Sequence, residues 1–288
     1  MPSRSVAVVT DSTSYLPAGL ADSQGIVVVP LQVVVDGRPG DEGLDVTPRD
    51  VIATLSARRP AITTSRPSPR RLAHAYAAAA QAAGTDAVVA VHLSRSLSGT
   101  VDAARIAAAD LSDLDVRVVD SRSTAMGLGF AVLAAAEAAR GGASADDVVR
   151  AARVAAARTH SVFYVDTLEH LRRGGRIGTA QALLGTALAV KPLLRIADGE
   201  IALLEKVRTS AKAIARLEDV AVELAGTGPV QVAVHHLGVP DKAADLAERL
   251  GERLGKQLGG ADVRVSEVGA VVGAHVGPGL LGVVVAQR

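Results

Sequence analysis

The sequence predicts an α/β protein of two domains, and two observations support this prediction. Short Val-rich runs alternate along the chain with Ala-rich amphipathic stretches. With 288 residues, the chain is also longer than a typical single domain. Near residue 159 the pattern of predicted strands and helices changes from regular strand–helix repeats to an α+β pattern, so we predict domains at residues 1–158 and 159–288. Because no long linker separates them, we expect a rigid pair with a cleft between.

The first domain is predicted to have three layers, α/β/α, around a mostly parallel sheet. Its strands are short runs of β-branched residues, typical of strands buried on both faces: residues 5–9, 26–30, 87–91 and 116–119. The helices between and after them are predicted at residues 48–58, 68–83, 98–111, 124–139 and 144–158. Thr47 before Pro48 and Ser68 before Pro69 are helix-start signals.

The second domain is predicted to have two layers, with helices on a mixed sheet. The expected strands are residues 161–165, 193–196, 200–204, 230–234, 263–266 and 281–286. The expected helices are residues 167–173, 209–224 and 241–258. Asp198-Gly199 lies between two of the strands and indicates a hairpin, because both residue types tolerate a positive φ.

Composition excludes several classes of protein. The chain has no cysteine, which rules out disulfides, thiolate metal sites and a cysteine nucleophile. Its 31 basic and 30 acidic residues form no basic run, which argues against nucleic acid as a partner. No apolar run reaches the length of a membrane span, and the first residues lack a signal-peptide pattern, so we expect a cytoplasmic protein. We expect neither a metal nor a nucleotide-binding loop.

Polar side chains follow three of the predicted parallel strands. They are Asp11 and Ser12, the loop at residues 94–100, and Asp120 with Ser121. The carboxyl ends of parallel strands share one edge of a sheet, where ligands commonly bind. Ordinary helix capping explains one such loop equally well, but three together favour an anion site.

Three further segments are candidates. Residues 63–69 are expected as a hydroxyl-rich turn that ends in a helix cap, and residues 272–279 as a glycine-rich loop around His275. Arg172, Arg173 and Arg176 flank a glycine pair. These arginines could bind phosphate or a partner, or they could simply be a solvated helix end.

Seven motifs occur in a fixed order along residues 4–286: residues 8–13, 64–68, 97–100, 119–121, 174–177, 191–192 and 273–279. In this order they resemble the DegV family. The resemblance implies the fatty-acid-binding subunit of bacterial fatty acid kinase, with one long-chain fatty acid between the two domains. A separate ATP-binding kinase subunit would phosphorylate the carboxylate. The subunit itself would have no complete catalytic site, and its only small-molecule partner would be the bound lipid.

The resemblance also assigns roles to residues. It places the carboxylate against Thr64, Ser65, Ser96, Ser98, Gly99, Thr100 and His275. Ser96 and Ser98 remain alternatives for one position, and His275 could act directly or through a water. Asp11, Ser12, Asp120, Ser121 and Arg66 would lie nearby. Arg66 departs from the family, which commonly has Gln there. Arg172, Arg173 and Arg176 would face the kinase subunit.

Two alternatives remain open. The chain could be a standalone hydrolase or phosphoryl-transfer enzyme that uses Asp11, Asp120, His275 and a serine of the 94–100 loop. The absence of an activated-nucleophile motif argues against this. Alternatively, a lipid could serve only as a folding cofactor of a regulatory protein.

Overall fold

The computed structural model describes residues 6–57, 61–183 and 191–288, which form two compact units. Unit 1 contains residues up to Gln32 and Ser65–Ala157, and unit 2 contains Val33–Thr64 and Arg158 onward. The chain thus changes unit at 157/158, next to the predicted boundary. It also does so at 32/33 and 64/65, so unit 2 includes residues 33–64, which the sequence places in the first predicted domain. The predicted element ends at Ser5 and Arg58 lie outside the described residues.

Unit 1 is built on a parallel sheet, four-stranded within the described residues, in the order β2-β1-β6-β7. The strands are β1 (Val6–Asp11), β2 (Ile26–Val29), β6 (Ala87–His92) and β7 (Asp115–Asp120). All four agree with the predicted runs. Every residue of β1 and β6 is buried, both the apolar runs that begin the strands and the polar residues Asp11 and His92 that end them.

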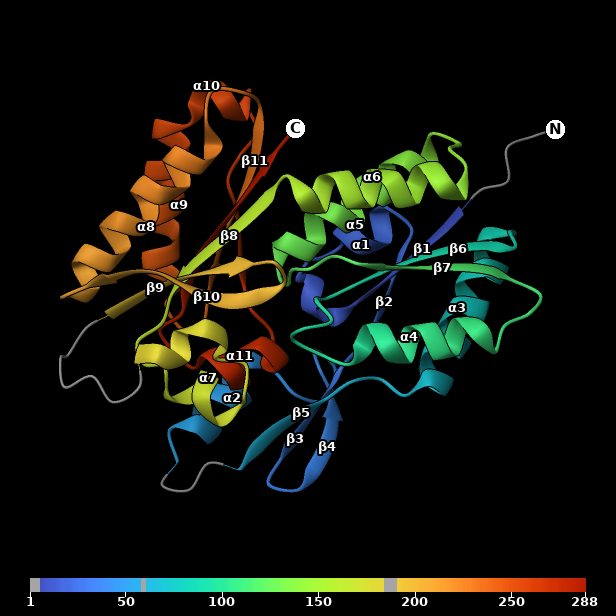
Figure 1. Ribbon diagram of the computed structural model, residues 1–288, viewed down its shortest axis with the longest axis horizontal. Helices are drawn as coiled ribbons and strands as arrows, with labels where there is room; N and C mark the ends of the chain where they lie inside the picture. Colours follow the sequence, from blue (N-terminus) through green and yellow to red (C-terminus); the bar gives the residue numbers. More distant parts are fainter. Residues whose placement is uncertain (1–5, 58–60, 184–190) are drawn as a thin grey trace. The chain divides into compact units, whose positions relative to one another are not determined.

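Helices cover both faces of this sheet, which confirms the three-layer prediction (Figure 1). One layer has α3 (Pro69–Ala83) and α4 (Thr100–Ala109), and the other has α5 (Met126–Arg140) and α6 (Ala145–Ala157). The short α1 (Leu20–Ser23) and the 3-10 turn η1 (Ser12–Ser14) lie between β1 and β2. Ser68 caps α3 by accepting a hydrogen bond from the Arg71 N–H, as the Ser-Pro signal predicts.

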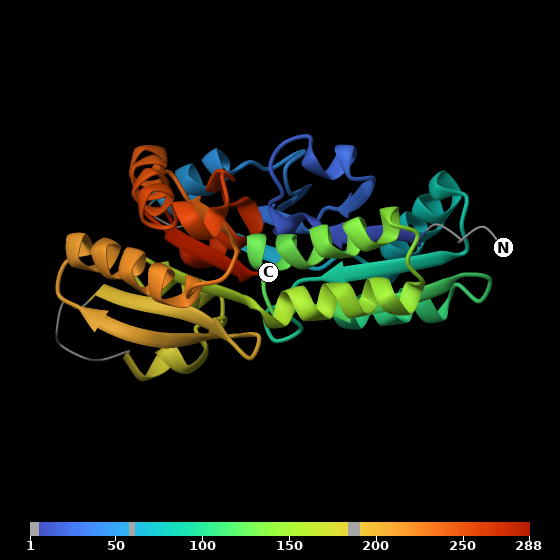
Figure 2. The same cartoon turned by 90° about the horizontal axis from the view of Figure 1, so that it is seen from above.

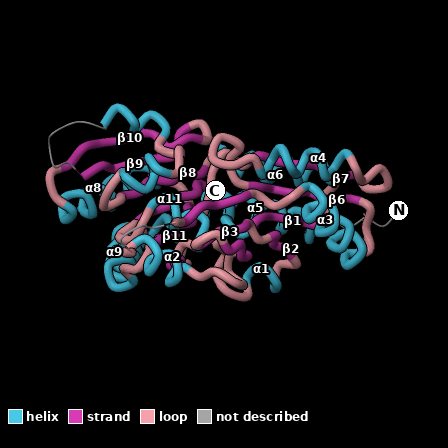
Figure 3. Tube along the Cα trace, turned by 90° about the horizontal axis from the view of Figure 1, so that it is seen from below, coloured by secondary structure: helices cyan, strands magenta, loops and turns pink. Residues whose placement is uncertain are grey.

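Unit 2 contains a mixed sheet, six-stranded in the described part of the chain (Figure 3). Its order is β10-β9-β8-β13-β11-β12, and only β11 and β12 pair in parallel. The strands are β8 (Thr159–Tyr164), β9 (Lys191–Ala197), β10 (Glu200–Val207), β11 (Val230–His236), β12 (Arg264–Glu267) and β13 (Leu281–Gln287). Asp198 and Gly199, at φ 52° and 86°, form the predicted hairpin between β9 and β10.

The core of this sheet lies beneath α8 (Ser210–Ala225), α9 (Pro240–Arg253) and α10 (Gly255–Leu258) (Figure 2). The sequence predicted one helix over residues 241–258, whereas the structure interrupts it at Leu254. Gly251 and Gly255, which are poor helix formers, flank this break.

Residues 33–64 add a small sheet and a helix to unit 2. The strands β3 (Gln32–Val35), β4 (Arg38–Asp41) and β5 (Ile62–Ser65) form a sheet in the order β4-β3-β5. The sequence predicts no strand here, and a turn is expected where β5 lies. These strands have four residues each, so they carry little local signal and depend on their pairing. The helix α2 (Pro48–Leu55) begins with the capping box Thr47–Asp50.

The segment around His275 is also corrected by the structure. It is not a loop, because residues Ala270–Val276 form α11. Gly273 provides close packing rather than flexibility, since a Cβ there would lie 3.2 Å from Leu237 and 3.5 Å from Val51. Two short elements complete unit 2, the helix α7 (Glu169–Arg173) and the 3-10 helix η2 (Gly178–Leu183). None of the helices in the described ranges is long and apolar enough to cross a membrane.

Candidate functional site

Thr64 and His275 form a hydrogen-bonded pair in unit 2. The Thr64 Oγ1 lies 2.8 Å from the His275 Nε2, and the pair is partly buried. Thr64 is carried by β5, a strand of the small sheet, and His275 by the last turn of α11. Two residues that the family resemblance assigns to a carboxylate are therefore brought together by the fold of one unit.

A pocket of about 180 Å³ opens beside this pair. It is lined by Leu55, Ile62, Thr63, Thr64, His170, Arg173, Gly174, Ala274 and His275. The lining combines aliphatic side chains with two threonines, two imidazoles and a guanidinium. Such a surface suits a small anionic group that is attached to an apolar body.

His275 is held neutral in this environment. Burial lowers the pKa of its imidazole to about 4, and the positive charge of Arg176 acts in the same direction. Its Nδ1 is buried and has no hydrogen-bond partner among the described residues. Gly174 packs against that nitrogen so closely that a Cβ there would overlap it. The imidazole is therefore what favours glycine at position 174, because the φ of −74° there suits any residue.

His170 is a pocket residue that the sequence analysis missed. Its pKa is lowered mainly by burial and further by Arg173, while Glu169 opposes the shift. Gly277, after α11, lies against its ring, where a Cβ would overlap it. The only sequence signal was its position two residues before Arg172, in the segment that precedes the 174–177 motif.

The three predicted docking arginines lie around α7. Arg172 and Arg173 both pair with Glu169, at 2.7 and 2.8 Å, and the bonds to these arginines lower the pKa of that carboxyl to about 2. Arg176 donates from Nη1 to the Gly174 carbonyl at 2.6 Å. The three arginines thus lie in one short segment at and just after α7, and Arg173 also lines the pocket.

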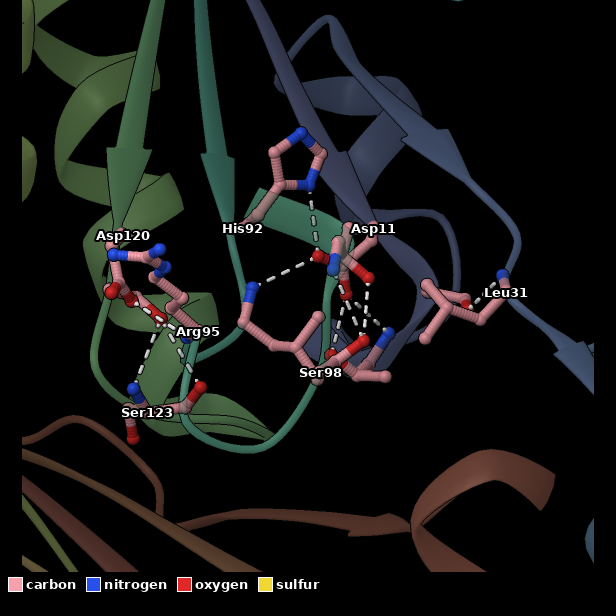
Figure 4. Close-up of polar contacts among 12 residues, drawn as sticks. Asp11, Leu31, His92, Arg95, Ser98, Asp120 and Ser123 are labelled. Atoms are coloured by element: carbon pink, nitrogen blue, oxygen red, sulfur yellow. Dashed lines mark hydrogen bonds and ion pairs between the residues drawn. The ribbon is translucent and has the colours of Figure 1, made fainter. Parts of the chain in front are cut away.

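Asp11 is the centre of a buried network in unit 1 (Figure 4). Its Oδ1 accepts from the N–H and the hydroxyl of Thr13, and its Oδ2 contacts His92 Nδ1 at 2.9 Å and the Leu93 N–H at 3.0 Å. The other nitrogen of His92 lies 2.8 Å from the Tyr76 hydroxyl. Asp11, His92 and Tyr76 are all 0% exposed. The network therefore fixes the start of the 94–100 loop at Leu93.

The predicted loop residues lie close together within unit 1. Ser98 Oγ is 2.8 Å from Thr100 Oγ1 and also accepts from the Thr100 N–H, so it supports the start of α4. The Ser96 N–H donates to Ser94 Oγ. The side chain of Arg66 packs over Gly99, where a Cβ would lie 3.1 Å from Arg66 Cδ.

The remaining predicted polar residues form hydrogen bonds within unit 1. Ser12 Oγ accepts from the Leu31 N–H at 3.0 Å. Asp120 Oδ1 accepts from the N–H groups of Arg95 and Arg122, and Ser121 Oγ donates to the Ser123 carbonyl. The Ser65 hydroxyl donates to the Arg66 carbonyl at 3.3 Å. His92 and Tyr76 were not predicted, because nothing in the sequence links them to Asp11.

The geometry constrains any catalytic use of Asp11. Both of its oxygens are engaged by four hydrogen bonds, and the group is fully buried, so it is not a free general base. Asp11 and His275 also belong to different units. Within residues 6–57, 61–183 and 191–288, no three His, Asp or Glu side chains are grouped to hold a metal ion.

Comparisons with known proteins agree along the whole chain. The family model described as "Uncharacterised protein, DegV family" matches residues 5–288. A DegV domain-containing protein of Streptomyces coelicolor is 56% identical over 286 residues, covering 99% of this chain and 100% of the relative.

Solved structures give the same result. The fold is similar to that of a fatty-acid-binding DegV family protein from Thermus thermophilus, with a TM-score of 0.90 and 34% identity, covering 99% of this chain and 100% of that one. It is also similar to DegV, a fatty acid binding protein from Bacillus subtilis, with a TM-score of 0.88, 33% identity and 99% of both chains covered. The chain therefore belongs to the DegV family.

Proposed function

We propose that this protein binds one long-chain fatty acid and presents its carboxylate to a separate ATP-dependent kinase subunit. The observation that carries the binding step is the Thr64–His275 pair at 2.8 Å beside a pocket with aliphatic lining. The similar structures from Thermus thermophilus and Bacillus subtilis are of fatty-acid-binding proteins, which supports the same ligand class here.

The unpartnered nitrogen of His275 suggests how the head group is held. A neutral imidazole has one N–H donor and one acceptor nitrogen. A proton on Nδ1 would leave a buried N–H unpaired, which is rarer and more costly than an unused lone pair. The proton therefore belongs on Nε2, which donates to Thr64 Oγ1. The hydroxyl hydrogen of Thr64 is then free to donate to a carboxylate oxygen of the ligand.

The acyl chain supplies most of the affinity. Each buried CH₂ contributes about 0.8 kcal/mol, so sixteen such groups give on the order of 10 kcal/mol before the cost of association. A carboxylate that leaves water must still find hydrogen-bond donors. We assign this role to Thr64 and, from the family motif, to a hydroxyl of the 94–100 loop, either Ser96 or Ser98.

Neutral donors suit a carboxylate that must react. In the proposed step one carboxylate oxygen attacks the γ-phosphoryl group of ATP on the kinase subunit. The bond to ADP breaks, and the products are acyl phosphate and ADP. A bidentate arginine would withdraw electron density from that oxygen, whereas Thr64 and a neutral His275 leave it more nucleophilic. Arg172, Arg173 and Arg176 provide a positive surface for the nucleotide-bearing partner.

Native mass spectrometry tests the binding step. The purified protein is expected to carry one long-chain fatty acid that appears in its organic extract. The delipidated protein should take up one equivalent of palmitate or oleate. A mass without adduct, unchanged after incubation with both lipids, would overturn the proposal. Incubation of the loaded protein with ATP and the kinase subunit of a bacterial fatty acid kinase then tests the second step. Acyl phosphate is expected, and its absence would restrict the function to lipid binding.

A further inference from the structure

Glu42 is a buried carboxylate that caps the helix carrying His275. It is 5% exposed, and its Oε1 accepts a hydrogen bond of 2.7 Å from the Val271 N–H, although 229 positions separate the two residues. The N-cap position of α11 is Gly269, which has no side chain with which to cap the helix. Glu42 supplies the missing acceptor, and the short distance is typical of a charge-assisted bond.

Glu42 and Thr64 contact α11 towards its two ends. Val271 and His275 are four residues apart, so the two contacts lie about one turn apart along the helix axis. Glu42 contacts the first of them through its N–H and Thr64 the second through its ring. Between them, Val51 of α2 faces Gly273, where a Cβ would lie 3.5 Å from Val51 Cγ1. The segment of residues 33–64 therefore holds α11 at its beginning, middle and end.

The small sheet connects Glu42 and Thr64, the two residues that contact the ends of α11. Glu42 directly follows β4, and Thr64 lies in β5, and both strands pair with β3. The separation of the carboxylate and the hydroxyl is thus set by the sheet, and α11 must fit between them. A side chain about 5–6 Å from a helix axis moves roughly 2 Å when the helix turns by about 20°. Such a movement would break the 2.8 Å contact between Thr64 and His275.

We propose that Glu42 is a positioning residue for the head-group pair. It fixes the rotation and axial position of α11, and thereby the direction in which His275 Nε2 meets Thr64. The inference rests on the proposed function only in that the Thr64–His275 pair is taken to hold the carboxylate. Its effect on the His275 ring is a property of the ligand-free protein.

The test compares Glu42→Ala, Glu42→Gln and the control Glu218→Ala. Glu218 is a carboxylate of the same unit, 9% exposed, and its ion pairs with Arg249 and Arg253 do not involve α11. Two quantities are measured well below each melting temperature: the Kd for palmitate, and the imidazole ¹H–¹³C resonances of His275 in delipidated protein, assigned with His275→Gln. Amide exchange at Val271 gives a third readout.

Glu42→Ala is expected to weaken palmitate binding at least tenfold, to shift the His275 resonances and to accelerate exchange at Val271. Glu42→Gln retains an acceptor, so it should stay within about threefold of wild type. Glu218→Ala should lower the melting temperature without changing the Kd or the His275 resonances.

Wild-type His275 resonances in folded Glu42→Ala would overturn the positioning role. Equal loss of binding in Glu218→Ala would overturn it too, because general destabilisation would then explain the effect. If Glu42→Ala does not fold, the variants Glu42→Gln and Glu42→Asp test the positioning role instead. The shorter Asp is expected to shift the resonances, and Gln is not; a wild-type spectrum for Asp would contradict the proposal. If wild-type protein binds no palmitate, the proposed function fails, and the apo resonances still test Glu42.

Discussion

The Thr64 hydroxyl and the His275 ring meet at 2.8 Å, although 211 positions separate them in the chain. The contact joins a strand of the small sheet to a helix near the C-terminus, and both belong to unit 2. It gives the pocket beside it a neutral hydrogen-bonding end. Several measurable consequences depend on this pair and on the buried network around Asp11.

Removal of the Thr64 hydroxyl should weaken lipid binding without unfolding the protein. Thr64→Val keeps the shape but removes the donor, so the lost hydrogen bond to a charged group is expected to cost about 1.5–3 kcal/mol of binding. Titration calorimetry with palmitate measures this as a rise in Kd of about 10-fold to 150-fold. Thr64→Ser is the matched control and should stay near wild type. A wild-type Kd for Thr64→Val would show that this hydroxyl does not hold the carboxylate.

Stability is expected to fall in acid partly through two buried histidines. Burial lowers the pKa of both His275 and His235 to about 4 in the folded protein, whereas an unfolded histidine titrates near 6.5. The unfolded state therefore binds more protons between pH 6.5 and 4. The contribution of the neutral histidines to the free energy of unfolding is complete above about pH 6.5. It is lost progressively as the pH falls, by at most about 1.4 kcal/mol per pH unit for each histidine.

Urea unfolding at several pH values measures this slope. His275→Gln should flatten the dependence between pH 6.5 and 4, because one titrating group is gone. His74→Gln, at an exposed position of α3, is the control for removing any one histidine. An unchanged slope in His275→Gln would contradict the depressed pKa of the buried ring.

The Asp11 network should contribute strongly to stability. In Asp11→Asn the amide group must face N–H donors of Thr13 or Leu93, so a loss of about 3 kcal/mol in the free energy of unfolding is expected. Tyr76→Phe leaves His92 without one partner and should cost about 1 kcal/mol. Chemical unfolding gives both values. Asp113→Asn is the exposed control, and equal values for Asp11→Asn and this control would exclude a structural role for the network.

Ser96 and Ser98 should respond differently to alanine. Ser98 contacts the hydroxyl and the N–H of Thr100, so Ser98→Ala is expected to lower stability by about 1 kcal/mol at the start of α4. The Ser96 hydroxyl makes no hydrogen bond among the described residues, so Ser96→Ala should leave stability unchanged. Paired measurements of unfolding and of palmitate Kd then show which serine binds lipid. If neither variant changes the Kd, the loop has no part in ligand binding.

Arg176→Ala should separate lipid binding from phosphorylation. Arg176 donates to the backbone of Gly174 and is exposed, so the variant is expected to keep a normal lipid content while acyl-phosphate formation slows at least tenfold. Arg153→Ala, on the exposed surface of α6, is the control. Loss of bound lipid in Arg176→Ala would place this arginine in the binding site and not at the partner surface.

Much of the fold followed from local patterns in the sequence. The buried strands of unit 1 are β-branched runs, and the helices α2, α3 and α8 begin at Thr47, Ser68 and Thr209, where a side chain accepts a backbone hydrogen bond. Such signals act within a few residues, so they can be recognised without knowledge of the tertiary structure. The same holds for the Asp198-Gly199 hairpin, where two neighbouring residues adopt positive φ.

Only the tertiary structure decided the surroundings of the site. The sequence identified Thr64 and His275 through motifs, but it gave neither the strand nor the helix that carries them. The strands of residues 33–64 are four residues long and exist because they pair with one another, and α11 begins where Glu42 reaches it from 229 positions away. In the same way, Asp11, His92 and Tyr76 become one network only because β1, β6 and α3 pack together. Contacts of this kind leave no periodic trace in the chain, because their energy comes from partners that are distant in sequence.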